Sequence, residues 1–163
     1  MKRLIFFLYT LILSLWIGGI TIFTFVVTPA IFSSYGRDTA GEIVGKLFPG
    51  YFTYTLVFSA LALVVFFLLN ADRSKKPFRL SLVLLIIALL ANAYVSFKLH
   101  PDTVRVKQQV ASFERESPDS VARKEFRRLH AMSAVINLFM LVDGVALLAL
   151  SRGLIKKKRV WLY

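Results

Sequence analysis

Four long apolar stretches constrain the fold of this chain more than any other feature. They cover residues 4–27, 48–70, 78–99 and 129–151. At 1.5 Å per residue, a helix over each stretch is about 33–36 Å long, enough to cross a hydrocarbon core of about 30 Å. Inside lipid the backbone must satisfy its own hydrogen bonds, so each stretch is expected to be a helix. The sequence predicts an all-α bundle of four transmembrane helices, with residues 1–163 forming a single integral membrane domain.

The distribution of lysine and arginine predicts how this bundle lies in the membrane. Basic residues are dense in three short segments: before the first span, between the second and third, and after the fourth. Cytoplasmic segments carry such an excess, so both termini are expected in the cytoplasm and the protein in the cell membrane. The run 156–159 is expected to bind anionic headgroups rather than nucleic acid. The first stretch is too long for a cleaved signal peptide, so a retained anchor is expected.

The two outer connections differ in length and charge. Residues 29–47 contain three glycines and predict a short loop, which ends where Pro49 occupies the first turn of the second span. Residues 102–128 are rich in both charge signs and predict a helical excursion outside the bilayer. Ser117 is expected to cap a restarted helix with Pro118 at its first position. That helix is expected to continue through the fourth span to Ser151.

Small and hydroxyl-bearing residues form a stripe along the first span. Such residues let membrane helices approach closely and form hydrogen bonds with one another. A helix-packing seam is therefore expected on this face, and the lining of a polar cavity is the alternative. The stripe consists of Thr10, Ser14, Gly18, Thr21 and Thr28.

Two blocks of sequence and one short motif match a known family pattern. The first block contains Thr24, Phe25, Val26, Phe32, Arg37, Thr39, Gly41, Lys46, Leu47, Phe48, Pro49, Tyr51 and Phe52. The second contains Phe126, Arg128, His130, Ser133 and Asn137, and the motif is 16–19 in the first span. This pattern resembles the transmembrane protein 205-like family, a four-span membrane family of unknown function. The resemblance implies four helices with both termini inside, and it implies no particular activity.

Three polar residues share one helix face at the start of the fourth span: His130, Ser133 and Asn137. A polar stripe within a span faces protein or a cavity rather than lipid. This one is expected to meet the aromatic block that begins the second span. It predicts either hydrogen bonds between helices or a ligand-binding pocket open to the outer side. The aromatic block contributes Phe48, Pro49, Tyr51 and Phe52.

The two histidines of the chain are candidate metal ligands. His100 ends the third span on the same outer side as His130, so the two imidazoles are expected near one another. Two imidazoles can hold a haem iron, and with further ligands a copper or zinc ion. No cofactor is expected in the resting protein, and haem, copper or zinc is the alternative.

Asp143 is the one acidic residue within a predicted span. Ionisable residues at such depth are candidates for function, because burying an unpaired charge is costly. Near the cytoplasmic end, Asp143 is expected to reach Arg152 or the basic loop 73–79. The alternative is that it handles a proton or a cation.

The motifs that are missing narrow the possible functions. The chain has no cysteine, which excludes disulfides, thiolate metal sites and cysteine nucleophiles. It also has no phosphate-binding loop, dinucleotide fingerprint or hydrolase elbow. We therefore expect a non-catalytic accessory, scaffold or small-ligand-binding protein that contacts the lipid bilayer and forms a homo-oligomer or part of a larger membrane complex. The alternatives are an oligomeric transporter of a small solute or metal, and a haem- or metal-binding redox protein.

Overall fold

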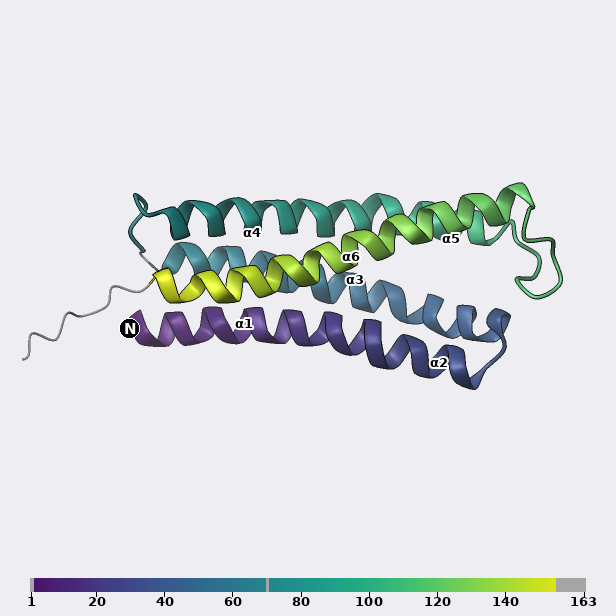
Figure 1. Cartoon of the computed structure of the whole chain (residues 1–163), viewed down its shortest axis with the longest axis horizontal. Coiled ribbons are helices and arrows are strands. Elements are labelled where there is room, and N and C mark those ends of the chain that lie inside the picture. The colour runs from purple at the N-terminus through teal and green to yellow at the C-terminus, as the bar shows by residue number, and fades with distance from the viewer. Residues whose placement is uncertain (1, 70, 155–163) are drawn as a thin grey trace, which may run out of the picture.

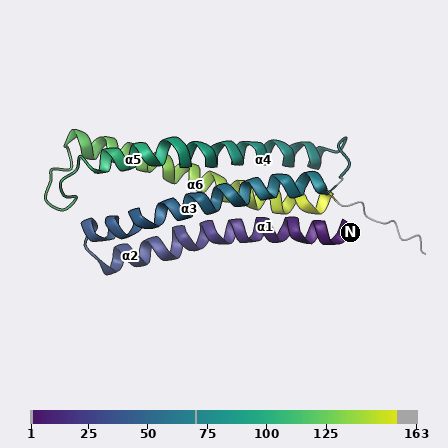
Figure 2. The same ribbon diagram turned by 180° about the vertical axis from the view of Figure 1, so that it is seen from behind.

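The computed structural model describes residues 2–69 and 71–154, and its regular elements are all helical (Figures 1 and 2). The basic run 156–159 lies outside these described residues. The elements are α1 (Lys2–Ile22), η1 (Phe23–Val27), α2 (Thr28–Ser34), α3 (Arg37–Leu68), α4 (Lys76–Tyr94), η2 (Val95–Leu99), α5 (His100–Lys107) and α6 (Val121–Leu154). The two η elements are short π-helical segments within longer helices.

The elements join into four long helices: Lys2–Ser34, Arg37–Leu68, Lys76–Lys107 and Val121–Leu154. Each is long and apolar enough to cross a membrane, which confirms the multi-pass helical bundle. In the bundle α1 packs against α3 and α6, and α4 packs against the same two helices from the other side (Figures 1 and 2). The helices therefore enclose one shared core.

All four helices extend beyond their apolar stretches at the same end of the bundle. With 32 to 34 residues each, they are about 48–51 Å long, well above the thickness of a hydrocarbon core. The expected loop over 29–47 is wrong, because α2 continues to Ser34 and α3 already begins at Arg37. Pro49 consequently lies inside α3, not in its first turn. The three glycines of this segment are helical or flank the helix start.

The second outer connection also differs from the expectation. α5 ends at Lys107, and residues 108–120 form turns, although the sequence predicts a helical excursion over residues 102–128 with a restart at Ser117. Ser120, not Ser117, caps α6: its Oγ accepts the N–H of Arg123 at 3.3 Å. The Ser117 hydroxyl instead accepts the N–H of Asp119 at 3.3 Å within the preceding turn. Pro118 therefore precedes the helix, and α6 begins at Val121.

The two π-helical segments have the same construction. The N–H of Thr28 bonds to the carbonyl of Phe23, and the N–H of His100 bonds to the carbonyl of Val95. In each case the next residue is a proline, so the second position of α2 and of α5 has no N–H. A proline ring clashes with the carbonyl four residues earlier in a regular helix. The wider π turn before each proline accommodates the ring without that clash.

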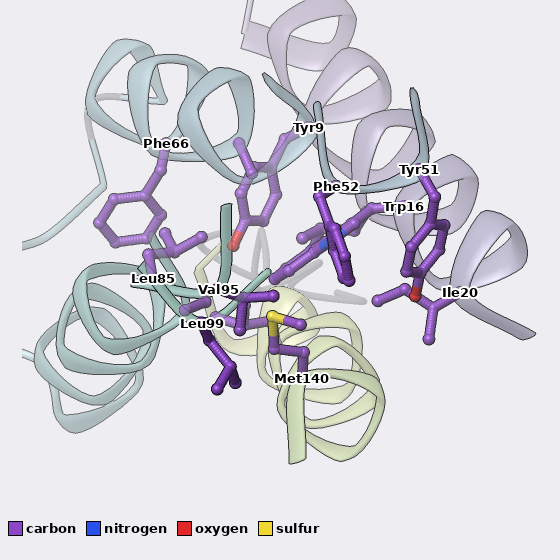
Figure 3. Packing of buried hydrophobic residues seen from close by; sticks show 14 of the residues in the cluster. Tyr9, Trp16, Ile20, Tyr51, Phe52, Phe66, Leu85, Val95, Leu99 and Met140 are labelled. Carbon is purple, nitrogen blue, oxygen red and sulfur yellow. The ribbon is translucent and has the colours of Figure 1, made fainter. Parts of the chain in front are cut away.

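The inner half of the bundle, residues 2–22, 53–69, 71–94 and 138–154, is closely packed. The side chains of Tyr9, Trp16 and Met140 point between the helices and are fully buried (Figure 3). The Phe66 ring contacts the Tyr9 ring at 5.9 Å and the Phe78 ring at 4.9 Å between centroids. Aromatic rings that pack tilted or offset in this way contribute strongly to a core. The remaining part, residues 23–52 and 95–137, is called the outer end.

The helix-packing seam of α1 is not the predicted stripe. Ser14 and Thr21 are exposed, and the Thr21 hydroxyl donates to the carbonyl of Ile17 in its own helix. A Cβ added at Gly18 would meet no atom within 4 Å, whereas one at Gly19 would collide with the ring of Tyr54. The close approach of α1 and α3 therefore occurs at Gly19. A stripe of small residues predicts contact poorly where lipid is an equally good neighbour.

Candidate functional site

The outer end contains a half-open cavity of about 330 Å³, here called the outer cavity. Its walls come from α2, α3, α5, α6 and the 108–120 connection, so every one of the four long helices contributes. This volume lies at the lower end of the range for small-molecule pockets. Most of the surface that the wall exposes is apolar, and its apolar side chains are Phe32, Val44, Phe48, Phe52, Val104, Phe113 and Phe126. The polar and charged residues are Thr28, Arg37, His100, Thr103, Lys107, Arg123, His130 and Ser133.

A smaller pocket of about 130 Å³, the deep pocket, lies next to the outer cavity on the side of the inner half. The two share five lining residues: Thr28, Phe48, Phe52, His130 and Ser133. In the deep pocket the Tyr51 hydroxyl donates to Oδ1 of Asn137, and Nδ2 of Asn137 donates to Oγ1 of Thr24 at 2.8 Å. This chain of hydrogen bonds joins α3, α6 and η1. The Tyr51 ring also stacks on Phe23, with centroids 4.1 Å apart.

Most of the site residues suggested by the sequence lie together around these two spaces. Phe48, Phe52, His130 and Ser133 line both, while Tyr51 and Asn137 line the deep pocket. Pro49 lines neither, because it is exposed on another face of α3. The structure therefore places the polar face of α6 opposite the aromatic block of α3.

Both histidines line the outer cavity. The imidazole of His100 lies 5.0 Å from the ring of Phe52 between centroids, and the imidazole of His130 stacks on Phe126 at 5.8 Å. Within residues 2–69 and 71–154 there is no group of three or more histidine, aspartate or glutamate residues arranged to hold a metal ion. The histidines are therefore the ligands available to a metal or haem here, with aromatic side chains as their immediate neighbours.

The 108–120 connection closes one side of the outer cavity. It is held to the start of α3 by Asp38, whose carboxylate accepts the Ser112 hydroxyl at 2.6 Å and the Phe113 N–H at 2.5 Å. The Phe113 ring in turn contacts Phe126 at 4.9 Å and lies 5.7 Å from the guanidinium of Arg123. These contacts fix an otherwise irregular segment over the cavity.

The same connection is organised internally by Glu116. The Ser120 hydroxyl beside this carboxylate holds the pKa of Glu116 below its ordinary value, and the N–H of Ala111 donates to Oε2 at 3.0 Å. Hydrogen bonds to a carboxylate favour its charged form in this way. The guanidinium of Arg123 donates to the backbone carbonyl of Glu116. Hydrogen bonds therefore hold the turn before α6 at both of its ends.

Three cationic residues of the cavity were not among the site candidates of the sequence. Arg37 begins α3, Lys107 ends α5 and Arg123 is in the first turn of α6. They lie 70 and 16 residues apart along the chain, so no spacing rule links them. A weak signal exists at Gly41 and Gly45, one helical turn apart: the carbonyl of Gly41 accepts a hydrogen bond from the ammonium of Lys107, and Gly45 leaves room for that ammonium. Such a glycine pair is also compatible with a loop.

Asp143 lies apart from both spaces, in the inner half. Its side chain is buried, and neither carboxylate oxygen has a hydrogen-bond partner among the described residues. The expected ion pair with Arg152 or with the 73–79 loop is absent within residues 2–69 and 71–154. Asp143 interacts electrostatically with Tyr9, whose hydroxyl is also buried without a partner. Asp143 is buried where α6 packs against its neighbouring helices.

The sequence matches a known family over residues 11–112, more than half of the chain. That family is described as Domain of unknown function (DUF4149). The chain belongs to this family. Within the DUF4149 match lie α3, α4, α5 and most of α1, whereas Phe126, His130 and Asn137 on α6 lie beyond it. The cavity is thus built from the matched region together with a helix outside it.

An uncharacterized protein of Aquifex aeolicus (strain VF5) is 33% identical to this DUF4149 chain over 89 residues. The match covers 55% of this chain and 64% of that relative, so less than two thirds of the relative's length is spanned. No solved structure matches the chain. These comparisons therefore define a family and leave the activity to be argued from the site.

Proposed function

We propose that this protein is a non-catalytic membrane protein of the transmembrane protein 205-like type that binds a small ligand in its outer cavity. The observation that supports this most directly is the cavity itself, about 330 Å³ in volume and walled by all four long helices. A scaffold whose helices only pack against one another has no need of such a space, since packed interiors leave few voids larger than a water molecule. The polar groups of the adjoining deep pocket give a ligand a fixed orientation.

Native mass spectrometry of the protein released from a mild detergent tests this proposal. The wild-type protein is expected to carry a small-molecule adduct from the membrane. Ser133→Phe, which fills the shared wall of both spaces, is expected to lose it. Val135→Phe is the matched control, because Val135 is 68% exposed and lines neither space. A wild-type protein without any adduct, or an adduct retained in Ser133→Phe, contradicts the proposal.

A second candidate is a haem- or metal-binding protein, favoured by the shared position of His100 and His130 on the cavity wall. The visible spectrum and the metal content of the purified protein test it. A haem band or stoichiometric metal that is lost in both His100→Ala and His130→Ala supports this candidate. Its absence from protein expressed with haem and metal in excess supports a ligand without metal.

We also propose that both termini lie in the cytoplasm, so that the outer cavity opens on the opposite side of the cell membrane. The chain has no cysteine, so single cysteines report their position without background. Cysteines at positions 39 and 114, both exposed, are expected to react with an impermeant maleimide in intact cells. A cysteine at the exposed position 75 is expected to react only after lysis. Labelling at 75 in intact cells reverses the orientation.

A further inference from the structure

The charge on the wall of the outer cavity has one sign. Arg37, Lys107 and Arg123 line it, and none of the residues that line it in the described part of the chain carries a carboxylate. None of these three side chains forms an ion pair within residues 2–69 and 71–154. The nearby acids are engaged elsewhere: Asp38 holds the 108–120 connection, and Glu42 pairs with Lys46 at 2.7 Å. The charged residues on the cavity wall are therefore all positive, while the carboxylates that interact with them, Asp38 and Glu42 with Lys107 and Glu116 with Arg123, lie outside the lining.

Lys107 is built into the wall rather than left free on the surface. Its Nζ donates to the carbonyl of Gly41 at 2.6 Å, and a Cβ added at Gly45 would lie 3.1 Å from this Nζ. The absence of a side chain at Gly45 thus leaves room for the ammonium to lie against α3. An ammonium has three donors, and the described structure assigns one of them. The other two are available to an acceptor in the cavity, although Glu42 and Asp38 act on this ammonium from a distance.

Arg123 adds a second fixed cation. It is only 9% exposed, its guanidinium donates to the carbonyl of Glu116, and it lies 5.7 Å from the Phe113 ring. A guanidinium has five N–H donors in a planar fork, so these contacts leave donors for an oxyanion. Arg37, by contrast, is exposed at the start of α3. Two cations are therefore held in place and the third lies at the edge.

The rest of the wall indicates that the ligand also has an apolar part. Five phenylalanines line the cavity, from α2, α3, the 108–120 connection and α6. The cavity also lies where the apolar stretches of the helices give way to charged sequence, which is the level of lipid headgroups. A compact anion alone would leave these aromatic surfaces without a partner. An uncharged hydrocarbon would leave the cations without one.

We propose that the outer cavity binds an amphiphile with an acidic head, its carboxylate or phosphate held by Lys107 and Arg123 and its hydrocarbon chain against the phenylalanines. This inference rests on the proposed function, to which it adds the ligand class. Free fatty acids and anionic phospholipids share this chemistry. Charge-assisted hydrogen bonds from Lys107 and Arg123 supply selectivity for the acid, and the aromatic wall supplies contact area.

The test uses the full chain in phosphatidylcholine nanodiscs, with bound molecules counted by native mass spectrometry. The probes are palmitate, the uncharged hexadecanol of equal chain length, and phosphatidylglycerol. Palmitate or phosphatidylglycerol is expected to bind at one per chain, about tenfold or more above hexadecanol, as hydrogen bonds to a charged group predict. Preference for palmitate identifies a free acid as the source, and preference for phosphatidylglycerol identifies the lipid headgroup.

Variants assign the effect to the cavity. Lys107→Gln is expected to reduce acid binding about tenfold or more and to leave hexadecanol binding unchanged, since one charged donor is removed. Lys98→Gln is the matched control, because Lys98 is exposed near the same helix and pairs with Asp102 at 3.1 Å. Lys107→Arg keeps the charge and is expected to retain the preference. Arg37→Gln, at an exposed position, is a further variant if Lys107→Gln does not fold, and is expected to weaken acid binding.

The two levels of the proposal fail in different ways. Hexadecanol binding equal to that of the acids, unchanged in Lys107→Gln and in Arg37→Gln, overturns the acidic ligand class while a ligand-binding cavity stands. No binding of any of the three probes, together with no native adduct, overturns the ligand-binding function itself. Equal losses of acid binding in Lys107→Gln and Lys98→Gln assign the attraction to the surface and also overturn the inference.

Discussion

The inner half and the outer end are built from the same four helices, yet the side chains of the inner half pack closely whereas those of the outer end leave cavities between them. In the inner half a Cβ on Gly19 would collide with Tyr54, and one on Gly144 would lie 2.8 Å from Ile17. In the outer end Gly41 and Gly45 instead line the outer cavity. The inner half also buries Asp143 without a partner, while the outer end arranges its polar groups around cavities. The comparison predicts that substitutions in the inner half affect stability more than substitutions in the outer end.

Alanine at Gly19 tests this contrast with the largest expected effect. Overpacking a filled interface costs about 1–3 kcal/mol, so Gly19→Ala is expected to unfold at a lower temperature in detergent. The Tyr54 ring cannot move freely, because its hydroxyl donates to the carbonyl of Leu15. Tyr54→Leu in the same chain is expected to restore part of the loss.

Two alanine variants serve as controls for Gly19→Ala. Gly18→Ala and Gly50→Ala place the same methyl group where it would meet no atom within 4 Å. Both are expected to be neutral or more stable than wild type, by up to about 1 kcal/mol, because alanine favours the helix. A loss in Gly18→Ala or Gly50→Ala equal to that in Gly19→Ala would show that the collision with Tyr54 is not the cause of the loss.

Replacement of Asp143 tests the unpartnered carboxyl of the inner half. A buried polar group without a hydrogen bond costs about 1–3 kcal/mol, so Asp143→Leu is expected to be at least as stable as wild type, with a gain of about 1 kcal/mol. Asp143→Asn keeps a polar group there and is expected to change little. Reversible unfolding in mixed micelles measures both. A clear loss of stability in the leucine variant would reveal a partner of the carboxyl.

The hydrogen bonds of the deep pocket are expected to give a smaller effect. A double-mutant cycle of Tyr51→Phe and Asn137→Ala measures the coupling between these residues, expected at about 0.6 kcal/mol for a hydrogen bond between membrane helices. Thermal unfolding of the two single variants and the double variant supplies the numbers. Additive effects would show that the hydrogen bond between Tyr51 and Asn137 does not stabilise the packing of α3 against α6.

The smallest effect on global stability is expected at Asp38. Loss of its bonds to Ser112 and Phe113 releases the 108–120 connection and leaves the inner half unchanged. Asp38→Ala is therefore expected to be cleaved faster by trypsin after Arg115, with an unaltered unfolding temperature. Glu42→Ala, which removes only an exposed ion pair with Lys46, is the control. Equal cleavage of the two variants would show that Asp38 does not hold the connection.

Much of this arrangement follows from the sequence, because lipid imposes a simple rule on long apolar stretches. The spacing of His130, Ser133 and Asn137 predicts one face of α6, and the structure places that face against Tyr51 and Phe52. Helical spacing and the family resemblance together therefore predict the polar residues of α6 and the aromatic block of α3. Helical spacing is informative here because both segments are regular helix.

The parts that sequence could not give depend on tertiary contacts. Glycines at 36, 41 and 45 are typical of a loop, but α3 begins at Arg37 because its first turns pack on the other helices, with Ala40 and Val44 buried. Lys107 and Arg123 converge only when α5 and α6 lie side by side. Residues from separate helices cannot be assigned to one cavity by spacing within either helix.

The π-helical segments shift the phase of two helices by a fraction of a turn. In α4 the inward positions alternate in steps of three and four, through Ser81, Leu85, Ala88 and Asn92. From Val95 onward they advance in steps of four only, to Leu99, Thr103 and Lys107. Each residue of an α-helix turns by about 100°, so deleting one residue within 95–99 would rotate Lys107 by that angle, away from Gly41. Loss of a single codon in this segment would therefore remove the ammonium from the cavity, although every residue that lines the cavity would still be encoded.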